Sequence, residues 1–274
     1  MIILFVFSFI LEATFLFVCA VPITILKILR ILPFGRNFFI SWSYRCYQLA
    51  VDFNYWYFFK LLNNHLEVEF PQKKSLKFHD NYLLLSNHQT WVDAVALQIV
   101  LQRAVPPPKF LVKKELLYFL PLGFLCWAID SPFLNRASIK GNKTSNKDDQ
   151  EAIKELIKVQ KDIFSSILIF AEGTRKKPHK MKNSRFKKLL NPKAGGAWIV
   201  LNSKLGISNI IDLTFSYNRP SYPFYYFLTG RLKIKCYVEV KKVPQITQYI
   251  DFKLWINELW RQKDQQLLND SFHC

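Results

Sequence analysis

Two residues with acid–base chemistry follow the apolar run at residues 82–86. Asn87 and His88 come directly after that run, and Asp93 stands five positions beyond the histidine. An imidazole acts as a general base when a neighbouring group fixes its tautomer and stabilises the charged ring. Along a regular helix Asp93 would lie on the wrong side of the axis, but a histidine just before the first turn lets the chain fold back. The pattern, weak on its own, predicts that His88 removes a proton from a substrate hydroxyl while Asp93 orients the ring.

A second group of chemically useful residues follows a second apolar run, at residues 167–171. This group consists of Glu172, Gly173, Thr174 and Arg175. A glycine lets the backbone approach a ligand closely, a threonine supplies a hydroxyl, and an arginine presents a charged planar fork that matches phosphate. In open α/β sheets, ligands gather beyond the carboxyl ends of the strands. We therefore expect the histidine and this anion-binding segment to share one rim of a sheet.

A strongly basic stretch continues from the second group. Nine Lys or Arg residues and no acidic residue occur between Arg175 and Lys193. Charge runs of this kind are usually solvated faces. Because this run adjoins the expected anion site, an equally open interpretation is that it binds phospholipid headgroups or an acidic carrier protein.

Short apolar runs alternate with helical patterns along the chain, which predicts an α/β domain. The strands and helices of this domain must position the residues described above. Candidate strands cover residues 66–70, 82–86, 109–112, 167–171, 210–216 and 231–240. Candidate helices cover residues 90–101, 114–118, 148–165 and 194–203. The last part of the chain has apolar residues at spacings of three and four, which predicts an amphipathic helix. Packing of its apolar face on the core is favoured over contact with a membrane.

The N-terminal segment is the clearest physical signal. Residues 1–26 carry a single charge, Glu12, and a helix of about 25 apolar residues can cross a ~30 Å hydrocarbon layer. Basic residues at Lys27, Arg30 and Arg36 follow the run and favour a cytoplasmic location for the rest of the chain. A cleaved signal peptide is disfavoured because no basic residue precedes the run. Since a buried carboxylate is costly, a helix that enters only one leaflet remains an alternative to a spanning one.

Composition agrees with a membrane setting. The chain has 274 residues, half of them apolar and 16% aromatic, with a net charge of +18. This combination favours a membrane surface over nucleic acid as the anionic partner. The five cysteines are scattered without a C-x-x-C pair, so we expect reduced thiols and no metal site.

Four regions follow from these patterns. Residues 1–36 are expected to form a transmembrane or membrane-embedded anchor, and residues 37–64 an aromatic interfacial helical region. A helix packed on the catalytic domain is an equally open interpretation of the aromatic region. Residues 65–245 should form the catalytic domain. Residues 246–274 should form the C-terminal amphipathic helix.

The two chemical groups together are similar to a known family signature. Asn87-His88 with Asp93, followed by Phe-Ala-Glu-Gly-Thr-Arg at residues 170–175, resembles the glycerolipid acyltransferases, the 1-acylglycerol-3-phosphate (lysophosphatidate) acyltransferase superfamily. The stretches PPPKFLVKKELLYFLPLGFLCWAIDSPFLNR and LLNPKAGGAWIVLNS, with the tail around WRQKD, resemble the bacterial YihG-like branch. The resemblance covers residues 65–245 and implies a mixed sheet flanked by helices.

The resemblance also implies an activity. A fatty acyl group would pass from an acyl thioester, acyl-CoA or acyl carrier protein, to the free hydroxyl of lysophosphatidate, with another lysophospholipid as the alternative acceptor. Neither a cofactor nor an enzyme nucleophile is implied, and the sequence contains no G-x-S-x-G elbow. The catalytic domain would face the cytoplasm from the bacterial inner membrane. A non-catalytic basic membrane-binding protein is the alternative from another class.

Residue roles carry over by position. His88 would be the base and Asp93 its partner, while Glu172, Gly173, Thr174 and Arg175 would form the acceptor site. Arg136, which closes SPFLNR, falls where the family has a further acceptor-binding arginine, although its spacing from Gly123 is longer than in the common form. The family's fourth block carries a proline within a strand, whereas here none occurs until Pro220.

Overall fold

A six-stranded sheet forms the centre of the protein. The computed structural model describes residues 2–29, 36–110, 112–113, 131, 133–134, 164–219 and 221–270. Within them the sheet has the strand order β1-β8-β7-β2-β6-β3. Its strands are β1 (His65–Glu69), β2 (Asn81–Ser86), β3 (Pro108–Phe110), β6 (Ser166–Phe170), β7 (Ile207–Tyr217) and β8 (Lys233–Lys242). Two short strands, β4 (Val112–Lys113) and β5 (Phe133–Leu134), form a separate parallel pair.

The sheet is mixed, as predicted. Strands β3, β6, β2 and β7 are parallel, β8 is antiparallel to β7, and β1 is parallel to β8. The carboxyl ends of β2, β6 and β7 therefore lie at one rim. Each of the six predicted strands has a counterpart within a few residues of its expected position.

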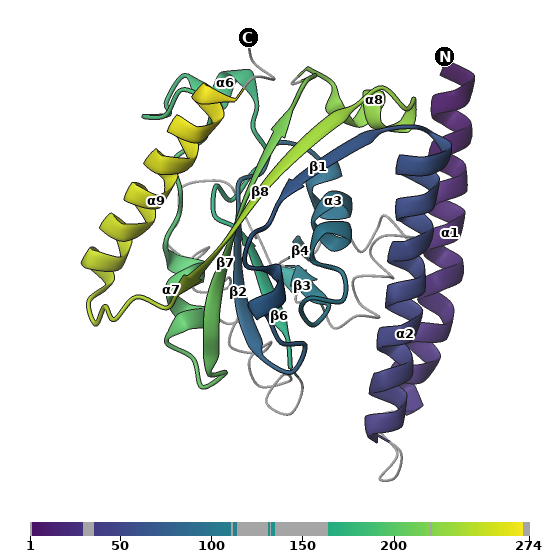
Figure 1. Ribbon diagram of the computed structural model, residues 1–274, viewed down its shortest axis with the longest axis horizontal. Helices are drawn as coiled ribbons and strands as arrows, with labels where there is room; N and C mark the ends of the chain where they lie inside the picture. The colour runs from purple at the N-terminus through teal and green to yellow at the C-terminus, as the bar shows by residue number, and fades with distance from the viewer. Residues whose placement is uncertain are drawn as a thin grey trace.

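Apolar layers cover both faces of the sheet, which is why the central strands are almost continuously apolar. On one face lie α3 (Val92–Leu101), α8 (Pro223–Leu228) and the π-helical turn η1 (Trp56–Leu61). On the other lie α7 (Gly195–Leu201) and α9 (Tyr249–Asn269). Alternate residues of β2 enter the two cores, with Leu84 in the first and Leu83 and Leu85 in the second. Figure 1 shows α9 and the N-terminal helices on opposite sides of the sheet.

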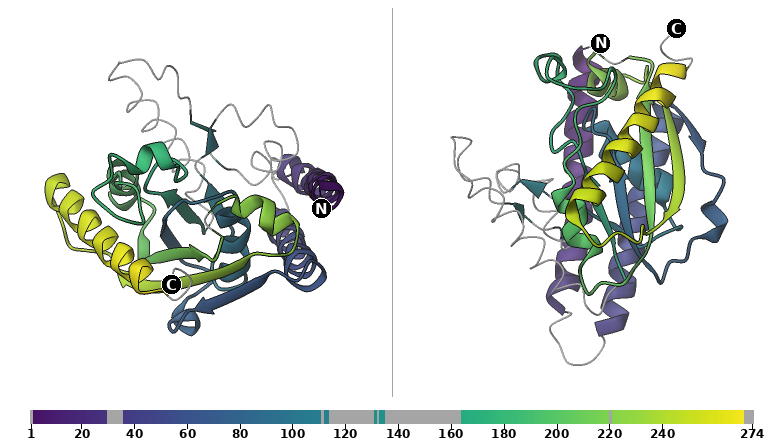
Figure 2. Two further views of the ribbon diagram at one scale, coloured as in Figure 1. Left: turned by 90° about the horizontal axis from the view of Figure 1, so that it is seen from above. Right: turned by 90° about the vertical axis from the view of Figure 1, so that its left-hand side faces the viewer.

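Two long helices open the chain. Helices α1 (Ile2–Leu29) and α2 (Arg36–Tyr55) lie side by side (Figures 1 and 2), and the rings of Phe15 and Phe53 stack between them at 3.8 Å. Over the described part of the chain, no helix is both long enough and apolar enough to cross a membrane. The predicted spanning anchor at residues 1–36 therefore gains no support from the fold.

The predicted aromatic region at residues 37–64 divides into two environments. In α2 and at the start of η1, Trp42 and Trp56 are exposed, whereas Tyr57, Phe58 and Phe59 are buried. Phe58 stacks on Phe227 of α8 with ring centroids 4.2 Å apart. The second half of this region is therefore part of the core rather than a membrane surface.

Backbone geometry joins η1 to the sheet. The Asn64 side-chain amide donates to the carbonyls of Phe58 and Phe227, and its oxygen accepts from the Leu232 N–H. Gly230 has a φ of 70°, and a Cβ at this position would lie 1.8 Å from the Leu62 carbonyl oxygen. Only glycine fits both the backbone conformation and this close approach.

The helices that flank the sheet agree in part with expectation. The helix predicted at residues 90–101 begins at Val92, and the C-terminal helix is α9. The apolar stripe of α9 is buried or half-buried from Phe252 to Trp260, whereas Tyr249 at its start is exposed. The short helices α6 (Pro178–Met181) and α8 were not predicted. The helix expected at residues 114–118, and residues 148–163 of the next one, lie outside the described residues.

Candidate active site

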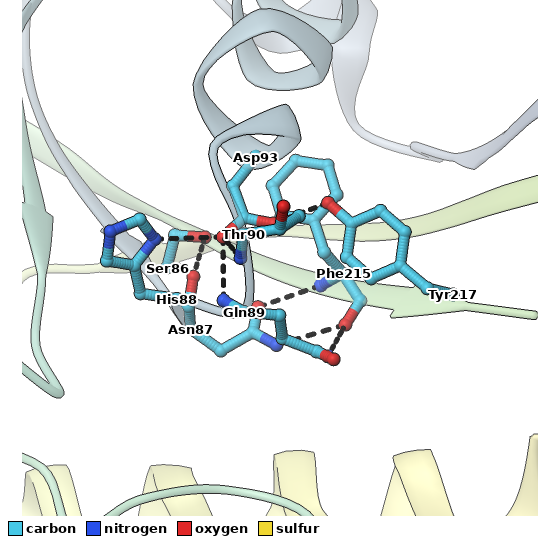
Figure 3. Close-up of polar contacts among 8 residues, drawn as sticks. All are labelled: Ser86, Asn87, His88, Gln89, Thr90, Asp93, Phe215 and Tyr217. Atoms are coloured by element: carbon cyan, nitrogen blue, oxygen red, sulfur yellow. Dashed lines mark hydrogen bonds and ion pairs between the residues drawn. The ribbon is translucent and has the colours of Figure 1, made fainter. Parts of the chain in front are cut away.

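The chain leaves β2 at a point fixed by the Asn87 side chain. The ladder between β2 and β7 ends at the pair Ser86 and Leu213. Beyond it, the Asn87 amide donates to the Phe215 carbonyl at 3.0 Å and its oxygen accepts from the Phe215 N–H at 2.8 Å (Figure 3). The side chain thus imitates one more rung of the sheet, which fixes the direction in which His88 leaves it.

His88 and Asp93 meet as the sequence predicted. The Nδ1 atom of His88 lies 2.9 Å from Oδ2 of Asp93. His88 precedes α3 and Asp93 occupies its first turn, so the chain folds back between them. Because a carboxylate can only accept, Nδ1 carries the proton in this pair, and Nε2 is left with the lone pair that a base requires.

Asp93 is held by several donors at once. Its Oδ2 also accepts the backbone N–H groups of Gln89 at 2.7 Å and Thr90 at 2.9 Å. Its Oδ1 accepts the hydroxyl of Tyr217, the last residue of β7. Burial and the neighbouring carboxylate raise the pKa of Tyr217 well above its ordinary value, so this hydroxyl stays protonated and donates. Hydrogen bonds to a charged acceptor are the strong ones, and together these contacts fix the carboxylate that orients His88.

The end of β6 and the segment that follows it contact His88 directly. The ring of Phe170, the last residue of β6, stacks on the imidazole of His88 with centroids 4.0 Å apart and planes inclined by 16°. The backbone N–H of Lys176 donates to the His88 carbonyl at 2.8 Å. The two motifs predicted to share a rim are therefore joined directly.

Arg175 lies on this rim beside an aromatic ring. Its guanidinium carbon is 4.5 Å from the centre of the Trp91 ring, a distance at which the cation is attracted to the ring face. Partial burial lowers the pKa of Arg175, and Asp93 opposes that effect. Thr174 accepts a hydrogen bond from the Lys180 ammonium. The rim thus places the positive charge of Arg175 near Asp93 and the base that it orients.

Glu172 has a different environment from the rest of its motif. The side chain is only 2% exposed, and neither carboxyl oxygen has a hydrogen-bond partner of good geometry. Burial, and secondarily Asp93, raise its pKa to about 8, although the nearby Trp260 indole, the His88 backbone and Lys263 act in the opposite direction. Its contact with an acceptor therefore stays a prediction.

The structure gives no position for one predicted site residue and bears on metal binding only where the chain is described. Arg136 falls outside the described residues. Among the residues described, no group of three or more His, Cys, Asp or Glu side chains could hold a metal ion.

A cavity of about 420 Å³ lies between α9 and the strands β7 and β8, on the opposite side of the sheet from α3 and α8.

Sequence comparison places the protein in a family. The acyltransferase family model matches residues 67–218, more than half of the chain, and the chain belongs to this family. The family model, together with the shared fold described below, supports its place in the glycerolipid acyltransferase superfamily. The YihG-like branch stays a prediction. No curated protein matches the chain.

A solved structure shares the fold. The crystal structure of the 1-acyl-sn-glycerophosphate (LPA) acyltransferase PlsC from Thermotoga maritima superposes with a TM-score of 0.60. The two sequences are 16% identical, and the match covers 95% of this chain and 96% of that one. At this identity, the likeness establishes a common fold.

Proposed function

We propose that the protein is a membrane-bound O-acyltransferase that acylates the free hydroxyl of lysophosphatidate from an acyl thioester. The observation that carries the proposal is the pairing of His88 with a buried Asp93, next to Arg175. Acyltransferase chemistry needs a base for the hydroxyl, and a phosphate-bearing acceptor needs a cation beside that base.

The reaction would proceed by direct transfer. Nε2 of His88 takes the proton of the acceptor hydroxyl as its oxygen attacks the thioester carbonyl. The tetrahedral intermediate then collapses with loss of the thiolate, which receives the proton from the imidazolium. No enzyme nucleophile is needed, because the thioester is already activated. Acyl-CoA and acyl carrier protein are both suitable donors, and no cofactor is required.

We also propose that α1 and α2 hold the enzyme at the inner membrane with the catalytic domain on the cytoplasmic side. Large apolar side chains are exposed on both helices, including Phe7, Ile10 and Val18 on α1 and Phe38 and Leu49 on α2. Exposed apolar surface of this extent is unfavourable in water and is typical of surfaces that bind lipid. The acyl chain of the acceptor would remain in the bilayer while its headgroup reaches the site.

A second acceptor class fits the same site. The Arg175 guanidinium stacked on Trp91 would recognise a phosphate, which every lysophospholipid carries, so remodelling of another lysophospholipid is the alternative function. An acceptor panel distinguishes the two, because the preferred headgroup will have the highest kcat/KM.

The test is transfer of an acyl group by membranes carrying the wild type, His88→Ala or His79→Ala. Labelled lysophosphatidate is supplied with an acyl-CoA or an acyl carrier protein, and phosphatidate is measured. We expect product from the wild type, a loss of roughly a hundredfold or more in His88→Ala, and wild-type activity in His79→Ala, since His79 is an exposed histidine of the β1–β2 connection. An inactive wild type with all acceptors would leave the non-catalytic membrane-binding protein as the better explanation.

A further inference from the structure

The C-terminal helix α9 lies beyond the segment that matches the family, residues 67–218, but its C-terminal half approaches the catalytic rim. Figure 2 shows the helix crossing the face of the sheet. Two adjacent residues of α9, Lys263 and Asp264, are both buried.

Lys263 binds the two strands that lead to the base. Its ammonium donates to the Leu213 carbonyl of β7 at 2.7 Å and lies 3.5 Å from the Leu85 carbonyl of β2. It also pairs with Asp212 at 2.6 Å. These contacts lie at the last rungs of the β2–β7 ladder, one step before Asn87 takes over the pairing. Lys263 therefore links the end of β2 to the neighbouring part of β7, one residue before the point where the chain leaves the β2–β7 ladder.

Asp264 binds the other half of the site. One carboxylate oxygen accepts the N–H groups of Lys188 at 2.7 Å and Leu189 at 3.1 Å, and the second accepts that of Lys187 at 3.0 Å. These three residues belong to the basic segment that starts at Arg175. A single side chain thus holds the backbone of that segment against α9.

Stability alone does not require buried charges such as Lys263 with its ion-pair partner Asp212, or Asp264. Burying an ammonium and a carboxylate together is expensive, and apolar residues of similar volume are often as good or better for stability. What apolar residues cannot do is bind main-chain carbonyls and N–H groups at fixed positions. A rigid supporting layer of this kind decides whether a catalytic group is held within the tolerance that catalysis needs.

We propose that Lys263 and Asp264 are positioning residues of the active site, with Lys263 fixing the end of β2, which presents His88, against β7, and Asp264 fixing the basic segment that follows Arg175. The inference rests on the proposed function and adds α9 to the machinery that performs it.

The experiment compares four variants with the wild type. Lys263→Met leaves Asp212 buried without a partner, whereas Lys263→Met combined with Asp212→Asn removes both charges and restores a neutral interior. Asp264→Asn replaces one of the two carboxylate oxygens by an amide NH2, so that at least one of the three N–H groups loses its acceptor and the others lose the charge. Arg261→Met is the control, because Arg261 is an exposed residue of the same helix and, within the described residues, its ion pair is with Glu258. Each is assayed for Tm, and for kcat and KM with lysophosphatidate and an acyl thioester.

If these residues position the active site, the variants should change kcat independently of Tm. The double variant should regain a Tm close to that of the wild type, yet its kcat should stay roughly 10- to 100-fold lower with little change in KM. Asp264→Asn should mainly raise KM for the acceptor, and Arg261→Met should match the wild type in every measurement. A double variant that recovers both Tm and kcat would show an ordinary structural ion pair and overturn the inference for Lys263. An unchanged KM in Asp264→Asn would overturn it for Asp264, and this variant decides the question if neither Lys263 variant folds.

Hydrogen exchange separates this inference from the proposed function. If the wild type acylates no lysophospholipid, the proposed function fails. Amide exchange at residues 85–88 and 213–217 still tests the positioning role, which predicts faster exchange there in the double variant than in Arg261→Met. Equal exchange rates in these two variants would contradict it.

Discussion

Replacing Glu172 by Gln tests the most unusual electrostatic feature of the site. This carboxyl is buried without a hydrogen-bond partner of good geometry, and burial raises its pKa to about 8. At neutral pH the folded protein therefore holds it mainly as the uncharged acid, whereas the unfolded chain ionises it with a pKa near 4.5. Glutamine copies the shape of the uncharged acid and cannot ionise.

The sign of the effect follows from proton linkage. Between pH 4.5 and 8 the folded state binds more protons at this group than the unfolded state, so stability falls as pH rises. The contribution of protonated Glu172 is fully present below pH 4.5 and is lost as the pH rises through 8. The two pKa values differ by about 3.5, and each tenfold change in proton affinity is about 1.4 kcal/mol. The loss is therefore about 5 kcal/mol, a large fraction of the stability of most domains.

The assay is urea unfolding, followed by tryptophan fluorescence in a mild detergent, at intervals from pH 5 to pH 9. The quantity of interest is the difference in unfolding free energy between Glu172→Gln and the wild type. That difference should grow in favour of the variant as pH rises and should level off above pH 8. Any fixed cost of burying the amide shifts the curve without changing its slope.

Glu258→Gln is the matched control. Glu258 is exposed on α9, and its hydrogen bonds with Arg261 lower the pKa of its carboxyl, so it is ionised throughout this range. Its difference from the wild type should be flat with pH. A flat difference for Glu172→Gln as well would refute the assignment of a raised pKa and, with it, the view that this residue is sequestered from solvent.

Three further predictions concern the geometry of the site and of the fold. Tyr217→Phe removes one hydrogen bond to the Asp93 carboxylate, so urea unfolding should show a loss of about 1.5–3 kcal/mol, and kcat should fall with KM unchanged; an unaltered kcat would mean that the remaining donors suffice. Arg175→Lys keeps the charge but loses the planar fork, and steady-state kinetics should show KM for a phosphate-bearing acceptor raised about tenfold, whereas an unchanged KM would place the phosphate elsewhere. Gly230→Ala should cost more than about 2 kcal/mol in thermal unfolding, because a Cβ there meets a backbone carbonyl, whereas Gly206→Ala, which has a φ of 60° and open space around it, should cost only the backbone strain of about 1–2 kcal/mol; equal costs would contradict the close approach.

The parts of the site that the sequence predicted correctly are those set by local chain geometry. A strand followed by a short connection and a helix brings His88 back to Asp93 within one turn, and the contact is a property of that segment alone. The same is true of the shared rim, because parallel strands end on the same side of a sheet whatever their order.

The supporting contacts could not be predicted because they join distant segments. Tyr217 reaches Asp93 from 124 positions away, and Lys263 reaches the Leu85 carbonyl from 178 positions away. Strand order and register decide such pairs, and several orders are compatible with the same alternation of apolar runs. The stripe on α9 correctly predicted a buried face, but Lys263 lies within that face as a charged residue, which hydrophobic periodicity does not anticipate.

Glu172 and Arg175 show why a motif predicts where a segment lies in the fold better than it predicts the environment of each of its side chains. Both belong to one four-residue motif, and the sequence assigned the whole motif to the acceptor. At Gly173 the backbone has a φ of 68°, a conformation that turns the chain sharply just after β6. As a result, Arg175 lies over the Trp91 ring at the rim while Glu172 is enclosed near Trp260 of α9. The turn thus gives neighbouring residues two opposite environments, one suited to a charged ligand and one that favours an uncharged acid, so their roles must be argued separately even though their sequence signal is shared.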